Sequence, residues 1–380
     1  MERTLLEVLV ELPDLRQAKG KRHEQAKVII LVVLALLCGQ NSLRRIAAWG
    51  QQLDPHSRRR LANRHGQVAR YGTIRRVLLG LEAEALAAAL QNWVEEVLAA
   101  YAPPAGLVGL ALDGKTLRGS AASEAELPAL QVLNAMVHPL AVVLDSQAVP
   151  SQTNELGAMP KFLQHLLLSG RVVTTDALHA QRDQAQIILE KEGHYLMRIK
   201  DNQPRTLATL EAWFQAQPSP MMPRTQDVFT EKGHGRLVRY TLQTTSALNA
   251  YLEQELAWPQ VGQTLCLERR AMGLKTGQVS TRYHYALTDL APAQADPATL
   301  FRLWHQHWHI ENKLHWVRDV DFAEDRSRTR AGSLPLILSL LRNAVISLLR
   351  LYGYDRITEA RTYFSLHLPL ACSFVGIPLE

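Results

Sequence analysis

The sequence has few cysteines, and its most apolar run is short. Only three of the 380 residues are cysteine, and Cys38, Cys266 and Cys372 show no Cys-x-x-Cys or Cys/His spacing. This usage argues against a structural zinc site and favours a reducing compartment. The most apolar run, residues 28–39, has about twelve residues, whereas a membrane span needs about twenty. It also begins too far into the chain for a signal peptide, so we expect a buried helix and a cytoplasmic protein without a membrane segment.

Internal repeats and low-complexity tracts are also absent, and 47% hydrophobic and 21% charged residues are typical of a globular protein. A chain of 380 residues exceeds the usual size of one domain, so we expect two or three. The net charge of +6 is unevenly spread. Residues 1–80 hold 15 Lys and Arg against 6 Asp and Glu, so the other 300 residues have a net charge of −3. A basic front end and a mildly acidic body are typical of a nucleic-acid anchor attached to a catalytic body.

The pattern of residues 1–102 predicts a helical, basic, DNA-binding domain. Apolar residues recur at helical spacing throughout this part of the chain. The pattern predicts the buried helix at 24–38, a helix at 43–53 capped by Ser42, and a long helix that starts from a cap at Thr73.

Two of these helices begin with paired arginines and are candidates for a helix-turn-helix whose second helix enters a major groove. The arginines expected to contact DNA are Arg44, Arg45, Arg75 and Arg76. The alternative is a helical bundle in which these side chains form a solvated face. Arginines that touch only phosphates would position the duplex without reading its sequence.

After the Pro103-Pro104 pair, short apolar and β-branched runs alternate with helical segments. Residues 103–204 read as three strands, a helix, a strand, a helix and a strand, which indicates an α/β fold with a mixed sheet. Residues 205–292 predict an antiparallel β insertion, and 293–350 return to helix. This order suits a ribonuclease-H-like catalytic core in two parts. The tail at 351–380 shows no clear pattern.

Three acidic residues stand at the ends or faces of these elements. Asp113 follows an apolar run and precedes a predicted Gly-Lys-Thr turn, Asp176 follows a second apolar run, and Glu311 lies on a helix-period segment. A single aspartate at a strand end is most simply a turn cap. Carboxylates from three separate elements, however, are suitable ligands for a hard divalent cation. We therefore predict a metal-dependent enzyme of phosphoryl transfer on DNA.

Several long, irregular motifs resemble those of the H-repeat-associated (ISAs-type) family of bacterial insertion-sequence DDE transposases. The resemblance runs from about residue 10 to 350. It rests on CGQNSLRRIAAW, ALDGKTLRGS, the TNE of SQTNEL, VVTTDALHAQR, KDNQP, EKGHGR and HWHIENKLHWVRDVDFAEDRSRTR. By motif, the two aspartates and the glutamate of the family fall on Asp113, Asp176 and Glu311. Their separations of 63 and 135 residues leave room for the β insertion.

The resemblance implies a ribonuclease-H-like core that binds two Mg²⁺ ions, for which Mn²⁺ substitutes. It implies that water cleaves double-stranded DNA at the transposon end and that the freed 3′-hydroxyl then attacks target DNA. It also implies a homodimer acting on paired ends. Two alternatives stay open: a domesticated DNA-binding protein that keeps the fold without transposition, and a metal-dependent endonuclease that cuts without joining.

Further residues are candidates for contacts to DNA. Lys115 and Arg118 come soon after the first aspartate and would contact the phosphate backbone, whereas His179 would touch the scissile phosphate or cap a helix. Related transposases often carry an Arg before the glutamate and a Lys after it, and His307 and Arg318 stand in those places. A histidine is cationic only part of the time near pH 7, so His307 would donate to a phosphate or pack among tryptophans.

An acidic group follows Glu311. Its members are Asp319, Asp321, Glu324 and Asp325, which we expect to pair with Arg326, Arg328 and Arg330. In an alternative interpretation one of these acids replaces Glu311 at the metal. Asn154 and Glu155 belong to a family motif but also suit a helix cap. The EKGHGR turn is a candidate DNA contact. The tryptophans at 304, 308 and 316 are expected in the core, with stacking on a flipped base as the alternative.

Overall fold

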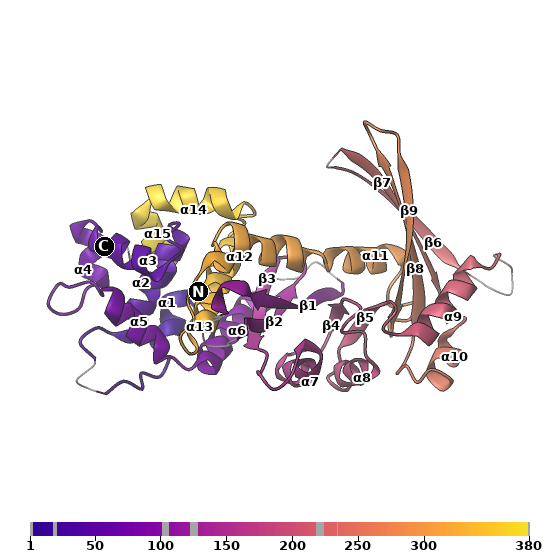
Figure 1. Ribbon diagram of the computed structural model, residues 1–380, viewed down its shortest axis with the longest axis horizontal. Coiled ribbons are helices and arrows are strands. Elements are labelled where there is room, and N and C mark those ends of the chain that lie inside the picture. Colours follow the sequence, from indigo (N-terminus) through magenta and orange to yellow (C-terminus); the bar gives the residue numbers. More distant parts are fainter. Residues whose placement is uncertain are drawn as a thin grey trace. The chain divides into compact units, whose positions relative to one another are not determined.

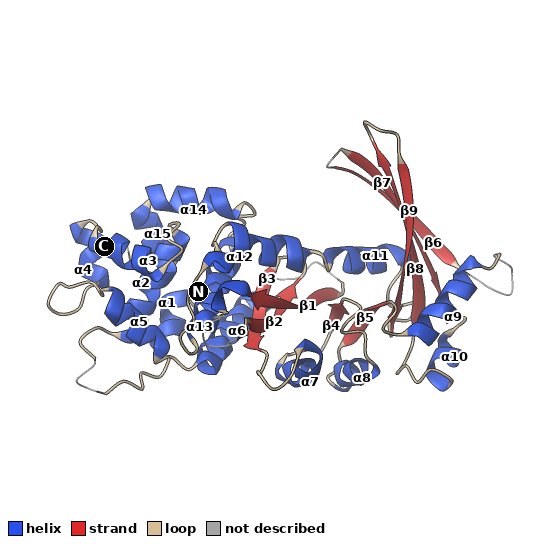
Figure 2. Cartoon of the chain, in the orientation of Figure 1, coloured by secondary structure: helices blue, strands red, loops and turns tan. Residues whose placement is uncertain are grey.

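The computed structural model describes residues 3–17, 21–100, 106–121, 128–217, 224–233 and 235–378. Its helices and strands form a mixed α/β architecture (Figures 1 and 2). The chain divides into two compact units. The helical unit consists of Met1–Gly106, Gly114–Ser151 and His309–Glu380, and the sheet unit of Leu107–Asp113 and Gln152–Trp308. Each unit joins segments that are distant in sequence, so the units cut across the five consecutive segments expected from the sequence. The Pro103-Pro104 pair lies outside the described residues.

An apolar helix, α2 (Gln25–Leu37), forms the centre of the helical unit. Every residue from Val28 to Leu37 is at most 1% exposed, which confirms the buried helix predicted at 24–38. Seven other helices pack against α2: α1 (Leu5–Val10), α3 (Leu43–Gln51), α4 (Pro55–Leu61), α5 (Tyr71–Leu79), α13 (Leu334–Leu351), α14 (Ile357–Leu366) and α15 (Leu368–Phe374). Helices α14 and α15 occupy the tail, which the sequence pattern did not reveal.

Helix α13 is the second buried helix of this unit. It is long and apolar enough to cross a membrane by length and composition, with a mean hydropathy of 1.6, but 94% of its residues are buried inside the protein. Its polar side chains, Arg342 and Arg350 among them, are buried as well, so protein covers the helix. In the described part of the chain it is the one helix that meets this test.

Of the two predicted starts of N-terminal helices, one is confirmed and the other is wrong. Helix α3 begins as predicted, since Ser42 Oγ accepts a hydrogen bond from the Arg45 backbone N–H at 3.4 Å. The single long helix predicted from Thr73 is wrong. Helix α5 begins at Tyr71 and ends before Gly80, and α6 (Ala83–Ala100) is a separate helix. Glycine is a poor residue for a helix interior, so the chain turns there.

Three strands belong wholly or partly to the helical unit: β1 (Val108–Leu117), β2 (Leu130–Val137) and β3 (Val142–Ala148). Their order is β3-β2-β1, β2 and β3 are antiparallel, and α6 and α13 pack on β3. The predicted turn at Gly-Lys-Thr is wrong, because β1 continues to Leu117 before a short 3₁₀ segment. Lys115 and Leu117 alternate as buried positions of the continuing strand, so the single Gly114 does not end it.

The sheet unit contains the first half of β1 and six further strands: β4 (Arg171–Thr175), β5 (His194–Ile199), β6 (Thr225–Gly233), β7 (Arg236–Thr245), β8 (Gln263–Gly273) and β9 (Val279–Thr288). Their order is β1-β4-β5-β9-β8-β7-β6. Strands β1, β4 and β5 are parallel, and the rest pair antiparallel. Helices of this unit are α7 (Glu155–His165), α8 (Arg182–Glu190), α9 (Pro204–Gln215), α10 (Asn249–Gln254) and α11 (Pro297–Gln306).

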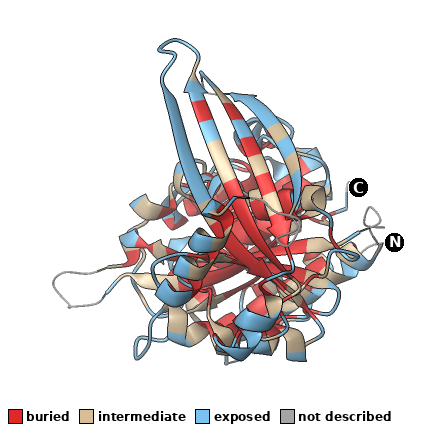
Figure 3. Ribbon diagram, turned by 90° about the vertical axis from the view of Figure 1, so that its right-hand side faces the viewer, coloured by how far each residue is buried: buried red, intermediate tan, exposed pale blue. Residues whose placement is uncertain are grey.

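The core of the sheet unit lies between α11 and the strands. Leu300, Phe301 and Leu303 of α11 pack in one cluster with side chains such as Leu242 and Leu265 of the sheet. Strands β7 to β9 are buried at the end that joins this core and exposed at the other end (Figure 3). The antiparallel β structure predicted within 205–292 is present in β6 to β9.

The first part of the helical stretch predicted over 293–350 is divided into three segments. Helix α11 ends in the sheet unit. A π-helical segment, η4 (Ile310–His315), and α12 (Trp316–Val320) follow in the helical unit, ahead of a short 3₁₀ turn, η5 (Glu324–Arg326). π-Helical turns often occur at functional sites.

Candidate functional site

Two of the predicted carboxylates lie side by side in the sheet unit. The parallel strands β1 and β4 pair in register as far as Leu112 with Thr175, and the next residues along them are Asp113 and Asp176. Neighbouring strands are about 4.8 Å apart, and parallel strands present their carboxyl ends at the same edge. Both aspartates are half-buried. The register of two apolar strands therefore brings these carboxylates together.

His179 lies beside Asp176, but its ring is buried. The His179 backbone N–H donates to Asp176 Oδ1 at 3.4 Å, and the residue is 1% exposed. Neither ring nitrogen has a hydrogen-bond partner among the described residues. Burial lowers the pKa of His179 against the opposing effect of the Asp176 charge, so the ring is neutral at pH 7. A buried neutral imidazole does not fit the predicted phosphate contact, and His179 instead orders the loop before α8.

Two further charged residues lie near Asp176. Burial lowers the pKa of Arg198 on β5, while the negative charge of Asp176 raises it. Burial, and then the charge of Asp176, raise the pKa of Glu155, the first residue of α7. Asn154 caps this helix, because its Oδ1 accepts from the Gly157 N–H at 2.9 Å. Sequence reasoning missed Arg198; the available signal was a cation inside the apolar strand HYLMRI.

His307, at the end of α11, contacts β4 two residues before Asp176. Its Nδ1 lies 3.0 Å from Thr174 Oγ1. Burial lowers the pKa of His307 to about 4, with Asp176 opposing this effect and the positive charge of Arg198 adding to it. The imidazole is therefore neutral at pH 7. It can serve as a hydrogen-bonding group, but not as the permanent cation that an arginine would supply at this position.

Glu311 belongs to the helical unit, where it lies exposed on the π-helical segment η4. The guanidinium of Arg350 holds this segment from the inside by donating to the carbonyl oxygens of Lys313 and Ala141. The His315 ring at its end lies 3.4 Å from the side-chain nitrogen of Asn134. The backbone that carries Glu311 is thus anchored on two sides by buried polar groups of its own unit.

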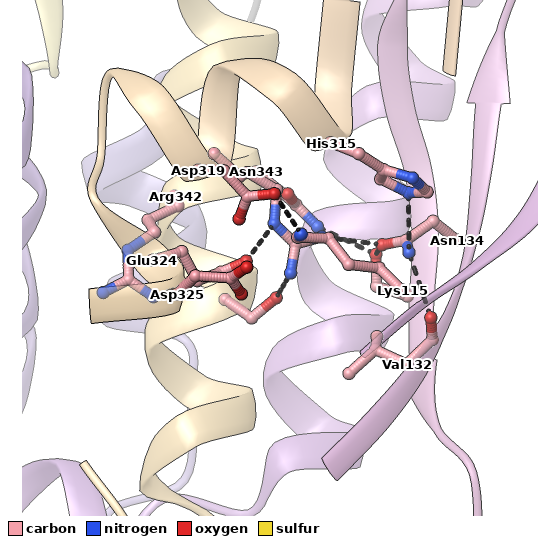
Figure 4. A network of polar contacts seen from close by, with 12 residues as sticks. Lys115, Val132, Asn134, His315, Asp319, Glu324, Asp325, Arg342 and Asn343 are labelled. Carbon is pink, nitrogen blue, oxygen red and sulfur yellow. Dashed lines mark hydrogen bonds and ion pairs between the residues drawn. The ribbon is translucent and has the colours of Figure 1, made fainter. Parts of the chain in front are cut away.

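A buried network of polar contacts follows η4 in the helical unit (Figure 4). Glu324 accepts from Arg318 Nε at 2.7 Å and from Arg342 Nη1 at 2.9 Å, and all three side chains are at most 2% exposed. Burial would raise the pKa of Glu324, but the two guanidinium groups outweigh it and lower the pKa. Arg318 also donates to Asn134 Oδ1 at 3.0 Å and to Ser339 Oγ at 2.5 Å. Every nitrogen of this guanidinium therefore has a partner inside the protein.

This network corrects two predicted DNA contacts. Arg318 is 0% exposed, so it cannot reach a phosphate in this structure. Lys115 is 7% exposed, and its Nζ lies 2.7 Å from Asp319 Oδ2. Burial raises the pKa of Asp319, and the ion pair with Lys115 acts against this. Lys115 and Arg318 are therefore both buried and paired with acidic residues of the protein.

The acidic group after Glu311 pairs with other cations than those expected. Asp319 binds Lys115, Glu324 binds two buried arginines, and Asp325 lies 3.7 Å from the Arg118 guanidinium. No described ion pair joins these acids to Arg326, Arg328 or Arg330. With Asp319 and Glu324 both paired, the interpretation in which one of them replaces Glu311 loses support.

The remaining predicted DNA contacts lie at the surface. Arg44, Arg45 and Arg76 are exposed, Arg75 is half-buried, and the Arg118 side chain is 81% exposed. Helices α3 and α5, which carry the paired arginines, pack against each other, but α4 separates them in sequence. Of the tryptophans, Trp304 packs in the core as expected, whereas Trp308 and Trp316 are 47% and 56% exposed.

In the described part of the chain, no group of three or more His, Cys, Asp or Glu side chains gathers closely enough to hold a metal ion. The paired aspartates still fit a magnesium site. Mg²⁺ keeps several waters and is commonly bound by one or two carboxylates together with substrate phosphates. The two half-buried carboxylates of Asp113 and Asp176 supply this kind of ligand.

The comparison with known families decides the assignment. A model described as "Transposase DDE domain" matches residues 104–341, and one described as "DDE_Tnp_1-associated" matches residues 6–94. The chain belongs to the DDE transposase family. Members of this family are nucleases and strand transferases that use divalent metal ions. The resemblance drawn from the motifs is confirmed.

Relatives extend over nearly the whole chain. A "Putative transposase YncI" of Escherichia coli O157:H7 is 27% identical over 91% of this chain and 87% of its own length. The "H repeat-associated putative transposase YhhI" of Escherichia coli K12 is 26% identical over 91% and 90%. A solved piggyBac transposase synaptic complex with hairpin DNA aligns with 98% of this chain and 77% of its own, at 12% identity and a TM-score of 0.44. That score is too low to support an argument.

Proposed function

We propose that this DDE transposase cuts DNA at the ends of its insertion sequence and joins the freed 3′ ends to target DNA, with Asp113, Asp176 and Glu311 as its catalytic carboxylates. The observation that carries the proposal is the register of β1 and β4, which places Asp113 and Asp176 side by side. The motif that resembles the family assigns the third carboxylate to Glu311. The parallel β1, β4 and β5, together with the β2–β3 hairpin, support a ribonuclease-H-like core.

The carboxylates would hold Mg²⁺, two ions by the resemblance, with Mn²⁺ as a substitute. Bound Mg²⁺ supplies charge stabilisation at the attacking and leaving oxygens of a phosphodiester. Asp113 and Asp176 are suited to this role because each comes directly after the paired residues Leu112 of β1 and Thr175 of β4, which fix its backbone. Neutral His307, held at Thr174, is suited to hydrogen-bond a DNA oxygen without competing with a cation for the carboxylates.

The exposed arginines of the N-terminal helices would bind the duplex at the transposon end. Phosphate contacts of this kind make affinity depend steeply on salt. We expect the protein to act as a homodimer on two paired ends, in the bacterial cytoplasm at the nucleoid. The two alternative functions, a DNA-binding protein without catalysis and an endonuclease without strand transfer, differ from this proposal in their products.

The test is incubation of a labelled duplex carrying the element's own ends with target DNA and Mg²⁺, using wild type beside Asp176→Ala. We expect cleaved and joined products from wild type and neither from the variant. Cleavage without joined product would favour an endonuclease. Tight DNA binding with no metal-dependent product would leave only the binding role.

A further inference from the structure

Two arginines face each other across strands β8 and β9. Arg269 pairs directly opposite Arg282 in the antiparallel register, so their side chains leave the same face of the sheet. Like charges in directly opposed positions destabilise a sheet. Arg282 is exposed and Arg269 half-buried, so an anion from solution can reach the pair and remove the repulsion.

The same face continues along β9 towards β5. His284 and Ala286 follow Arg282 at alternate positions, and Arg198 of β5 pairs opposite Ala286. Arg198 Nη2 lies 2.8 Å from His284 Nδ1, so the imidazole accepts from the guanidinium. Burial, and the positive charges of Arg198, Lys200, Arg269 and Arg282, lower the pKa of His284 to about 4. Four cations therefore surround one neutral histidine.

These four cations, Arg198, Lys200, Arg269 and Arg282, form what we call the basic strip. In the part of the chain that the structure describes, none of them has an Asp or Glu partner at ion-pair distance. This contrasts with Arg318 and Arg342, which share a buried glutamate.

One end of the strip adjoins the paired aspartates. Thr175 of β4 pairs with Met197 of β5, so the next residues along these strands, Asp176 and Arg198, lie beside each other, and the charge of Asp176 acts on Arg198. From the row of Arg198 to the row of Arg282 the strip runs four residues along β9. That is roughly 13 Å at the usual rise of a strand, or about four nucleotides of one DNA strand along the helix axis.

We propose that the basic strip binds the phosphate backbone of the DNA that enters or leaves the paired aspartates, over about four nucleotides. The inference rests on the proposed function and adds a DNA-binding surface on β5, β8 and β9 that sequence motifs did not indicate. Phosphates suit this surface because they are closely spaced anions, whereas a single carboxylate would neutralise only one of the four charges.

The same strands provide a matched control. Arg239 of β7 and Arg270 of β8 are also directly opposed, and both are exposed. Because successive residues of a strand alternate, this pair leaves the opposite face from Arg269. The double variants Arg269→Gln/Arg282→Gln and Arg239→Gln/Arg270→Gln thus remove the same charge from the same sheet, on opposite faces.

The experiment measures binding of the full-length protein to a fluorescent duplex carrying the element's end, without divalent metal and over a range of salt. Loss of two phosphate contacts lowers the slope of log K against log salt by about 1.8, and we expect at least about tenfold weaker binding at 0.1 M salt for Arg269→Gln/Arg282→Gln. The control pair should change binding less than threefold. Thermal unfolding of Arg269→Gln/Arg282→Gln should occur at the same or a higher temperature, since a repulsion is removed.

Equal losses in both double variants, or no loss in either, would overturn the proposal. So would a lower unfolding temperature that accounts for the weaker binding, or displacement by an acidic polypeptide but not by unlabelled DNA. The outcome is separable from that of the proposed function. Wild type that binds through the strip but yields no metal-dependent product would overturn the catalytic proposal alone, and cleavage with an unchanged slope in the strip variant would overturn the strip alone.

Discussion

Asp176 and Glu324 are two acidic residues with opposite surroundings. Glu324 is 3% exposed and accepts from two guanidinium groups at 2.7 and 2.9 Å. Asp176 is half-buried, its one described hydrogen bond is a backbone contact of 3.4 Å, and no described residue forms an ion pair with it. A carboxylate that is already paired with two cations is a poor ligand for a metal ion. A carboxylate without an ion-pair partner remains able to bind one.

The same contrast applies to the cations. Arg318 and Lys115 of the helical unit have acidic partners in the same unit, and the cations of the basic strip have none at ion-pair distance among the described residues. Paired charges serve the packing of the fold, and charges without partners identify the surface and site where an external ligand completes the pairing.

The largest expected effect is on catalysis. Asp176→Asn should lower the rate of DNA cleavage by roughly 10³-fold or more, because a lost metal ligand removes several kcal/mol of charge stabilisation in the transition state. Circular dichroism and thermal unfolding should be unchanged, since Asp176 has no ion-pair partner to lose. Full activity of this variant, or loss of its folded structure, would contradict the proposed catalytic role of Asp176 and its difference from Glu324.

Glu324→Gln should instead lower the stability of the folded protein. It leaves two buried guanidinium groups without their carboxylate, and we expect the free energy of unfolding to fall by about 3–5 kcal/mol. Denaturant unfolding monitored by tryptophan fluorescence measures this. A destabilisation below 1 kcal/mol would show that the network is not a buried ion-pair cluster. As a control, Glu359→Gln alters an exposed pair and should cost almost nothing.

The dependence on pH follows from the direction of the pKa shift. The pKa of Glu324 is lower in the folded protein than its ordinary value of 4.5, so its stabilising contribution is complete above about pH 4.5 and is lost as the pH falls through the folded pKa. The difference in unfolding free energy between wild type and Glu324→Gln should therefore be constant from pH 5 to 8 and shrink below. A difference that grew on acidification would contradict the assignment.

The smallest effect is expected at Lys115 and Asp319. Asp319 is about one-third exposed, so solvent screens the pair, and a double-mutant cycle with Lys115→Met and Asp319→Asn should give a coupling of about 1 kcal/mol or less. Cleavage activity of Asp319→Asn should stay within about threefold of wild type. A loss of activity as large as that of Asp176→Asn would instead make Asp319 a metal-binding residue.

The parts of this arrangement that depend on residues close together in the sequence could be predicted. Apolar runs before Asp113 and Asp176 predict two buried strands. The course of β1 past Gly114 could not be predicted, because tertiary pairing of Lys115 with a residue 204 positions away holds the strand. The burial of Arg318 depends on similarly distant partners, Asn134 and Ser339 among them, which no spacing reveals.

The most direct measurement of the central claim is Mn²⁺ binding by calorimetry, without DNA, to wild type, Asp176→Asn and Asp319→Asn. The account predicts at least about tenfold weaker binding for Asp176→Asn, since a carboxylate ligand is lost, and unchanged binding for Asp319→Asn. Unchanged binding in Asp176→Asn, or an equal loss in both variants, would contradict the claim that Asp176, and not the ion-paired Asp319, holds the metal.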